Sequence, residues 1–185
     1  MKIFAIYLRF NLTQKPEWFD EFRSKYSSTS ILHITLIQPR YVSEDRIEYV
    51  KSIVMETLEK YKFNEQDKKL IFSKTELEKE NNGNYILMTF IRENKSIFDL
   101  QKFLLKTLEE FNNYCDEETM GYESNFRPHL TIADRIAPEF KEETLKYITE
   151  DSRFEGNIKD LVLAVVKEQT ISESEDFDNW HVFDV

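Results

Sequence analysis

The sequence has few of the residues on which several common kinds of site depend. It contains one cysteine, Cys115, and three glycines among 185 residues. One thiol can form neither an intramolecular disulfide bond nor a four-cysteine zinc site, so we expect a protein of the reducing cytoplasm. Three glycines are too few for the glycine-rich loop with which many folds hold phosphate groups. Three histidines do not exclude a metal site by number, but their spacing gives it no support, and we expect neither a bound cofactor nor a metal ion.

Positive charge and long apolar runs are also scarce. The chain has 25 Lys and Arg residues against 35 Asp and Glu residues, which gives a net charge of −10. This balance would repel duplex DNA, whereas a small nucleotide or the end of an RNA strand remains compatible with it. The apolar run near the start, residues 3–8, ends at Arg9 and is too short for a signal-peptide core or a membrane span. We expect a protein that is neither exported nor bound to a membrane.

The residues that are present predict an α+β protein, and the length fits one well-cored domain over residues 1–185 or two small lobes that share a core. We expect a monomer. Strand-like patterns occur at 2–10, 31–38, 69–77, 85–91, 129–135, 161–166 and 180–185. Apolar residues at helical spacing occur at 17–26, 44–61, 96–114 and 138–148. The acidic segments 112–125 and 170–179 are typical of loops, and Pro39 is expected to end the second strand. The order of elements suggests two similar halves.

Each half contains one strand with the pattern His-x-Thr. HITLIQPR begins at His33 and HLTIADR begins at His129, so two of the three histidines share this frame. Side chains at positions i and i+2 leave the same face of a strand, which pairs His33 with Thr35 and His129 with Thr131. If the two strands face one another across a cleft, one neutral imidazole can accept a proton from an attacking oxygen while the protonated partner gives one to the leaving oxygen. The threonine hydroxyls would then hold the phosphate oxygens.

A structural explanation of the same pattern stays open. Threonine favours strands, and a single strand histidine more often forms a structural hydrogen bond than a catalytic one. His181, the third histidine, has Phe183 instead of threonine two residues later, and we interpret it as structural.

The two motifs resemble those of a known family. FRPHLTIADR, residues 126–135, is similar to the Phe-x-Pro-His-x-Thr-x-Ala signature of the two-histidine (2H) phosphoesterase superfamily, which includes 2'-5' RNA ligase-like proteins and cyclic phosphodiesterases. HITLIQPR, residues 33–40, resembles the first motif of that family, a His-x-Thr-Leu strand ended by proline. The resemblance implies a bilobal, pseudo-symmetric α+β fold with mainly antiparallel sheets, a central cleft and outer helices.

The resemblance also implies an activity and the residues that carry it. The expected reaction is metal-independent hydrolysis of a cyclic phosphate or a 2'-5' phosphodiester in a small nucleotide or an RNA end. His33 and His129 correspond to the general acid/base pair, and Thr35 and Thr131 to the phosphate-binding hydroxyls. Two alternatives remain open, namely reversible 2'-5' ligation of RNA ends and a non-catalytic nucleotide-binding module.

Four further residues are candidates for substrate binding. Tyr7 lies on the first strand and could stack on a base, or it could belong to the core. Arg40 follows Pro39 and could contact phosphate, or it could be an ordinary loop residue. Arg127 shares the strand parity of His129, with surface solvation as the alternative.

The fourth candidate, Arg135, marks a departure from the family pattern. The family often has arginine directly after the alanine of the second motif, where this chain has Asp134. Counting by strand parity places Arg135 on the face of His129 and Asp134 on the other face, provided that the strand stays regular. Tyr114 and Tyr122, on either side of the acidic loop, could also stack on a base from above.

Overall fold

The computed structural model describes residues 1–27, 29–117, 119–148 and 152–185. The strands of these residues form one seven-stranded sheet in which every pairing is antiparallel. Its order is β2-β1-β6-β3-β4-β5, and β7 pairs with β6. The strands are β1 (Lys2–Gln14), β2 (His33–Val42), β3 (Lys69–Lys79), β4 (Tyr85–Ile91), β5 (His129–Ile136), β6 (Glu155–Val166) and β7 (Trp180–Phe183).

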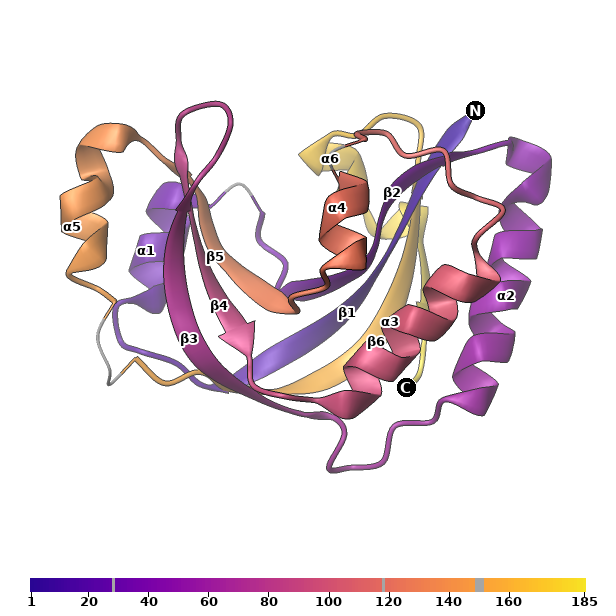
Figure 1. Ribbon diagram of the computed structural model, residues 1–185, viewed down its shortest axis with the longest axis horizontal. Coiled ribbons are helices and arrows are strands. Elements are labelled where there is room, and N and C mark those ends of the chain that lie inside the picture. Colours follow the sequence, from indigo (N-terminus) through magenta and orange to yellow (C-terminus); the bar gives the residue numbers. More distant parts are fainter. Residues whose placement is uncertain (28, 118, 149–151) are drawn as a thin grey trace.

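Helices lie on the outside of this curled sheet at both of its ends, and a short helix lies within its opening (Figure 1). They are α1 (Phe19–Tyr26), α2 (Ile47–Lys60), α3 (Lys95–Thr107), α4 (Thr119–Ser124), α5 (Lys141–Leu145) and α6 (Ile171–Ser174), with short 3-10 turns η1 (Glu44–Arg46), η2 (Pro138–Phe140) and η3 (Phe177–Asn179). α2 and α3 lie beside one half of the sheet and α1 and α5 beside the other (Figure 1). The predicted α+β class and mainly antiparallel architecture are therefore confirmed. Among the described residues, no helix is long and apolar enough to cross a membrane.

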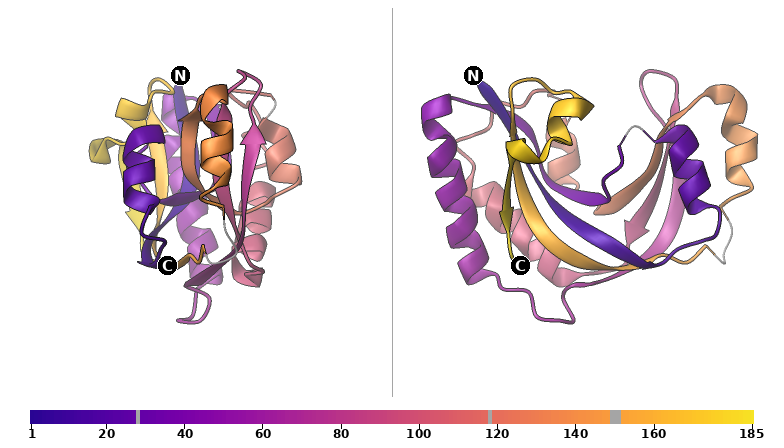
Figure 2. Two further views of the ribbon diagram at one scale, coloured as in Figure 1. Left: turned by 90° about the vertical axis from the view of Figure 1, so that its left-hand side faces the viewer. Right: turned by 180° about the vertical axis from the view of Figure 1, so that it is seen from behind.

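β3 joins the two halves of the sheet. Its first residues, 69–71, pair with β6, whereas its later residues, 72–79, pair with β4. The sheet is strongly curled, and β2 and β5 stand at the two ends of its strand order. Because of this curl, these two strands contact each other in the middle of the molecule (Figures 1 and 2). This curvature brings the two motif strands together although they are far apart in the sequence.

The second strand does not end at Pro39 as expected. β2 continues to Val42, and its register with β1 shifts between Ile37 and Arg40. Such a bulge accommodates a proline, which has no N–H to donate to the ladder. On the other side of β2 the Pro39 carbonyl accepts a hydrogen bond from the Cys115 backbone at 3.0 Å, which holds the strand beyond the proline.

The two segments expected to be loops contain helices. The helix predicted over 96–114 ends at Thr107, and 112–125 contains α4. The acidic segment 170–179 contains α6, where the Thr170 hydroxyl accepts a hydrogen bond from the Glu173 backbone at 3.3 Å, and then η3. Both helices are short, so apolar periodicity could not show them. Their stabilising contacts come from capping and from distant residues.

Candidate active site

The four motif residues lie at the contact between β2 and β5. His33 is the first residue of β2 and His129 is the first residue of β5. Both histidines and both threonines are half-buried, while the residues between them, Ile34 and Leu130, are buried in the core. This alternation turns His33 and Thr35, and likewise His129 and Thr131, away from the core toward the cleft.

The cleft consists of two adjoining cavities. The first, here called the His129-side cavity, has a volume of about 570 Å³ and is lined in part by Thr35 and His129. The second, here called the His33-side cavity, has a volume of about 460 Å³ and is lined in part by His33, Thr35 and Thr131. The residues that line both are Thr35, Gln38, Glu80 and Ile86. The structure thus brings all four motif residues to one cleft.

The two imidazoles are held in the same way. Nδ1 of His33 lies 3.4 Å from the carbonyl oxygen of Ile31, and Nδ1 of His129 lies 2.7 Å from the carbonyl oxygen of Arg127. A carbonyl oxygen only accepts hydrogen bonds, so Nδ1 carries the proton in both rings. In the neutral form this leaves the lone pair on Nε2, and each histidine is fixed as the tautomer that can accept a proton there.

Burial lowers the pKa of both histidines below the ordinary value of 6.5. For His33 the neighbouring charge of His129 acts in the same direction, while the carboxylate of Glu175 opposes it. For His129 the hydrogen bond to the Arg127 carbonyl and the carboxylate of Glu78 oppose the effect of burial. Both imidazoles are therefore mainly neutral at pH 7, and protonation of one favours the neutral state of the other.

Arg23 supports the site, although it is not among the residues predicted from the sequence. It lies on α1 and is 8% exposed; its Nη1 donates to the carbonyl of Thr131 at 2.8 Å and its Nη2 to the carbonyl of Thr29 at 2.7 Å. It thereby links β5 to the segment that leads into β2. A signal was present, because Arg23 shares the buried face of α1 with Phe19 and Tyr26, where a charged residue is unusual.

The prediction for Arg135 is wrong because β5 is not regular. The register between β4 and β5 shifts twice beyond Thr131, and Ile132 and Ala133 are both buried. This bulge reverses the alternation, so that Asp134 lines the His33-side cavity. Arg135 lies on the opposite side of β5, where it is exposed and lines neither cavity. It donates a hydrogen bond to the Ser27 carbonyl.

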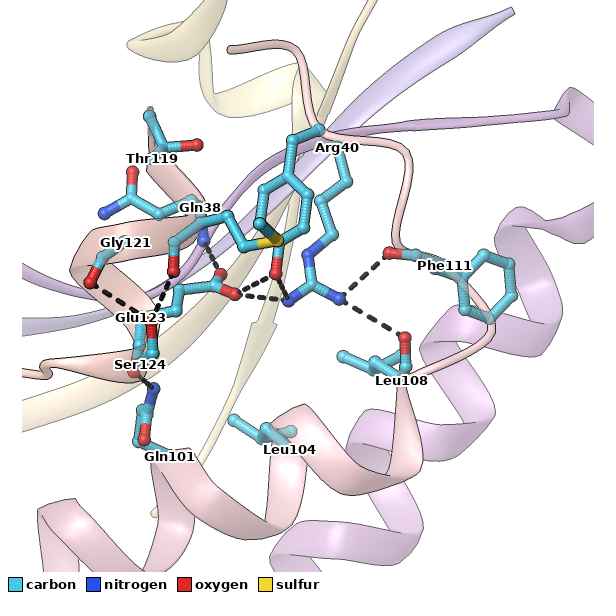
Figure 3. Close-up of polar contacts among 12 residues, drawn as sticks. Gln38, Arg40, Gln101, Leu104, Leu108, Phe111, Thr119, Gly121, Glu123 and Ser124 are labelled. Carbon is cyan, nitrogen blue, oxygen red and sulfur yellow. Dashed lines mark hydrogen bonds and ion pairs between the residues drawn. The ribbon is translucent and has the colours of Figure 1, made fainter. Parts of the chain in front are cut away.

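Arg40 is buried in the protein and lines neither cavity. It is 1% exposed, and its Nη2 lies 2.5 Å from Oε2 of Glu123 on α4 (Figure 3). Its Nη1 donates to the carbonyl oxygens of Leu108 and Phe111, and its guanidinium lies over the ring of Tyr114. The structure therefore gives Arg40 a structural position in place of the expected phosphate contact.

Glu123 connects this ion pair to the cleft. Its Oε1 accepts a hydrogen bond from the backbone N–H of Gln38 at 2.6 Å, and its Oε2 accepts one from the hydroxyl of Tyr114 at 2.5 Å. Gln101 on α3 donates to the Glu123 carbonyl (Figure 3). α4, which supplies part of the wall of the His129-side cavity, is thus fixed to β2 next to the motif residues.

The remaining predicted residues lie at the cleft. Arg127 is at the rim of the His129-side cavity, where it pairs with Glu76 and Glu78 and lies 4.1 Å from the ring centroid of Phe90. Tyr7 lines the His33-side cavity, and its ring centroid is 5.1 Å from that of His33.

Of the other two candidate tyrosines and the third histidine, one tyrosine lies at the cleft. Tyr122 is exposed and lines the His129-side cavity, whereas Tyr114 belongs to the buried network around Glu123. His181 pairs with Leu163 between β7 and β6 and lines neither cavity. Within the described ranges, no group of three or more His, Cys, Asp or Glu side chains is arranged to hold a metal ion.

No protein-family model and no curated protein sequence matches this chain. Among solved structures, the fold matches Usb1 of Kluyveromyces marxianus with a TM-score of 0.53 and 9% sequence identity, over 99% of this chain and 98% of Usb1. Usb1 is a member of the 2H phosphoesterase superfamily. The chain has the 2H phosphoesterase fold.

Two further 2H phosphoesterase structures are similar with TM-scores of 0.49. E. coli LigT complexed with 3'-AMP is 11% identical, and the match covers 100% of this chain and 93% of LigT. Usb1 of K. marxianus with uridine monophosphate is 8% identical, and the match covers 97% of this chain and 98% of Usb1.

Proposed function

We propose that this protein is a phosphoesterase that hydrolyses a cyclic phosphate or a 2'-5' phosphodiester in a small nucleotide or an RNA end. One observation carries the proposal. Two histidines from opposite edges of the sheet lie at one cleft, and each is held through Nδ1 by the carbonyl two residues earlier in the chain. The threonine two residues after each histidine lines the same cleft. A structural histidine would account for one such arrangement. It would not account for its repetition on both sides of one cleft.

In this mechanism the two histidines act at the same phosphorus. The neutral Nε2 of one ring accepts the proton of the attacking water oxygen while that oxygen bonds to phosphorus. The protonated Nε2 of the other ring gives its proton to the ester oxygen as the phosphorus–oxygen bond breaks. The hydroxyls of Thr35 and Thr131 donate to the non-bridging oxygens. The products are a phosphomonoester and an alcohol, and the two histidines have exchanged protonation states.

The charge around the cleft favours hydrolysis over ligation of RNA ends. The carboxylates that line the cavities are those of Glu78, Glu80, Asp116, Asp134 and Glu175. Among the described residues, the Lys and Arg side chains that line them are those of Lys79 and Arg127, and Arg127 is already paired with carboxylates. Such a cleft disfavours two long phosphate chains held end to end.

The test is turnover of 2',3'-cyclic nucleotides and 2'-5'-linked dinucleotides in EDTA by the wild type, His33→Ala and His129→Ala. His181→Ala serves as the matched control, because it removes a histidine outside both cavities. We expect each motif variant to lose roughly a hundredfold or more in kcat and the control to stay within about twofold. Binding of a nucleotide without turnover, weakened in both motif variants, would favour the nucleotide-binding module. Activity that survives both substitutions would contradict the mechanism.

A further inference from the structure

The carbonyl that holds His33 lies outside the sheet. Residues 29–32, here called the His33 strap, belong to no helix or strand, yet Nδ1 of His33 donates to the carbonyl of Ile31 in this strap at 3.4 Å. A bond of the same length, from the Phe10 N–H to the Leu32 carbonyl, ties the strap to β1. Both bonds are long, because hydrogen bonds of this kind typically measure about 2.9–3.0 Å. The orientation of the imidazole therefore depends on the other contacts that hold the strap.

Glu175 holds the His33 strap with its carboxylate. This residue follows directly after α6, and its Oε1 accepts hydrogen bonds from the Thr29 hydroxyl at 2.5 Å and from the Ser30 backbone N–H at 2.6 Å. Its Oε2 accepts a third hydrogen bond, from the Ser30 hydroxyl at 2.9 Å. Hydrogen bonds to an ionised carboxylate are roughly twice as strong as neutral ones. Two successive residues of the strap are thus bound to one side chain of a distant segment.

The strap lies between this carboxylate and a second side chain. Nη2 of Arg23 on α1 donates to the Thr29 carbonyl at 2.7 Å. Glu175 is itself presented by a fixed segment, because Nε1 of Trp180 on β7 donates to the carbonyl of Ser174 at 2.8 Å. The position of the strap is therefore set by α1 on one side and by the segment between β6 and β7 on the other.

The segment before His129 is held in a different way. Nδ1 of His129 donates to the Arg127 carbonyl at 2.7 Å, and the next carbonyl, of Pro128, accepts a hydrogen bond from the Ile91 N–H of β4 at 2.9 Å. The backbone of β4 therefore fixes this segment directly. In the other half of the molecule, the carboxylate of Glu175 takes the place of a neighbouring strand.

Glu175 is ionised over the pH range in which histidine titrates. Burial acts to raise its pKa, but hydrogen bonds from Thr29, Ser30 and the Ile31 backbone outweigh this effect, and the pKa lies below the ordinary 4.5. The carboxylate therefore keeps its hydrogen bonds and its charge while the imidazoles change their protonation states.

The charge of Glu175 also acts on the His33 ring. The titratable and charged groups near His33 are Tyr7 and Arg9 of β1, Arg23 of α1, Glu80 after β3, His129 and Asp134 of β5, Asp160 of β6, and Glu175. Burial lowers the pKa of His33, and the charges of His129 and Arg23 act in the same direction. The carboxylate of Glu175 acts against them and favours the protonated ring.

We propose that Glu175 is a positioning residue for His33: by binding the strap, it holds the carbonyl that keeps the imidazole proton on Nδ1 and the lone pair on Nε2. The inference rests on the proposed function and adds to it a residue outside the two His-x-Thr motifs. Glu175 acts through the strap and not on the reacting phosphate, so its loss lowers kcat and leaves KM nearly unchanged.

The first experiment measures kcat and KM of Glu175→Ala and Glu175→Gln on the ester that the wild type hydrolyses best. Alanine releases the strap, and we expect kcat to fall by about tenfold or more with KM within about threefold. Glutamine retains an oxygen for Thr29 and the Ser30 backbone and should recover most of this loss. Glu173→Ala is the matched control, because Glu173 also binds backbone N–H groups but lines neither cavity, and its kcat should stay within about twofold. Normal kcat in a folded Glu175→Ala, or a glutamine variant no better than alanine, would overturn the inference.

The second experiment observes His33 without substrate, by 15N NMR of the imidazole nitrogens, with the His33 signals identified by their loss in His33→Ala. In the wild type at about pH 8 we expect a protonated Nδ1 and an unprotonated Nε2. Glu175→Ala should give a mixture of both tautomers. Glu175→Gln should keep the wild-type tautomer while His33 titrates at lower pH, because the hydrogen bonds remain and the charge is gone. Glu173→Ala should match the wild type in both respects.

The outcomes separate the inference from the proposed function. If no ester is hydrolysed, the proposed function is wrong, and the NMR measurement decides the role of Glu175 by itself. If an ester is hydrolysed but the His33 signals do not respond to Glu175→Ala, the inference is wrong and the proposed function stands. If Glu175→Ala does not fold, Thr29→Val replaces it, since it removes the shortest of the three hydrogen bonds. An unchanged His33 tautomer in that variant would contradict the inference.

Discussion

Arg40 and Glu123 form an ion pair whose side chains are 2% and 4% exposed, with Nη2 of the arginine 2.5 Å from Oε2 of the glutamate. The pair joins β2, which carries His33 and Thr35, to α4, which forms part of the wall of the His129-side cavity. The same glutamate accepts a hydrogen bond from the Gln38 backbone. One buried contact therefore connects the position of this wall to the strand that carries the first motif.

Substitution of Glu123 by glutamine should destabilise the protein strongly. The amide keeps the shape of the side chain but leaves the guanidinium of Arg40 buried without its counter-ion, and we expect the free energy of unfolding to fall by about 3–5 kcal/mol. Glu110→Gln is the matched control, because it breaks the Arg46–Glu110 pair, whose side chains are 40% and 46% exposed. That change should cost at most about 1 kcal/mol. Urea denaturation of both variants measures the difference, and equal losses would show that burial of the first pair has no special effect.

The two threonines should affect kcat more than KM. Thr35→Val and Thr131→Val keep the branched shape but remove the hydroxyl that we expect to contact the phosphate in the transition state. Removal of one such donor typically lowers kcat by roughly a hundredfold. Thr35→Ser and Thr131→Ser retain a hydroxyl and should recover most of the activity. A valine variant with normal kcat would remove that threonine from the mechanism.

The bulge in β5 predicts different results for two arginines near the second motif. Arg127 lies at the rim of the His129-side cavity, whereas Arg135 points away and bonds to the Ser27 carbonyl. We expect Arg127→Ala to lower kcat/KM by about tenfold and Arg135→Ala to change it by less than about threefold. Steady-state kinetics on the same substrate decide between them. A larger effect of Arg135→Ala would mean that β5 is regular in the active protein.

Stability should depend on pH through the two motif histidines. Burial lowers the pKa of both in the folded state below the ordinary 6.5, so the unfolded chain binds protons more readily than the folded protein as the pH falls. Their contribution to stability is therefore complete above about pH 6.5 and is lost as the pH falls through their folded-state pKa values. We expect the free energy of unfolding of His33→Ala and of His129→Ala to fall less between pH 7 and about pH 5 than that of the wild type. Parallel curves would contradict the lowered pKa values.

Local sequence patterns predicted most of the regular structure. The strand expected at 85–91 is β4 with the same ends, and the His-x-Thr frame correctly placed each histidine and threonine on one face of its strand. These features depend on alternation within a few residues, which the sequence displays directly. The resemblance to the 2H phosphoesterases correctly predicted the fold, although no family model matches the chain.

The features that sequence patterns missed depend on distant contacts. The parity count for Arg135 was wrong because two register shifts against β4 reverse the alternation, and nothing in HLTIADR marks them. α4 was missed because it is fixed by the burial of Glu123 against Arg40, 83 positions away in the sequence. Arg23 was missed because its partners are backbone carbonyls of other segments, which residue identities do not reveal, and the available signal was its place on the apolar face of α1.

The most direct test of the central claim is the pH dependence of kcat/KM, measured in EDTA from about pH 4.5 to 9 for the wild type, His33→Ala and His129→Ala. This ratio reports the ionisations of the free enzyme, and a phosphodiester does not titrate in this range. Because the pKa of both histidines is lowered, we predict a bell-shaped profile with its maximum below pH 6.5, and the loss of one limb in the residual activity of each variant. A flat wild-type profile, or variants that keep both limbs, would contradict a mechanism in which His33 and His129 share the transfer of protons.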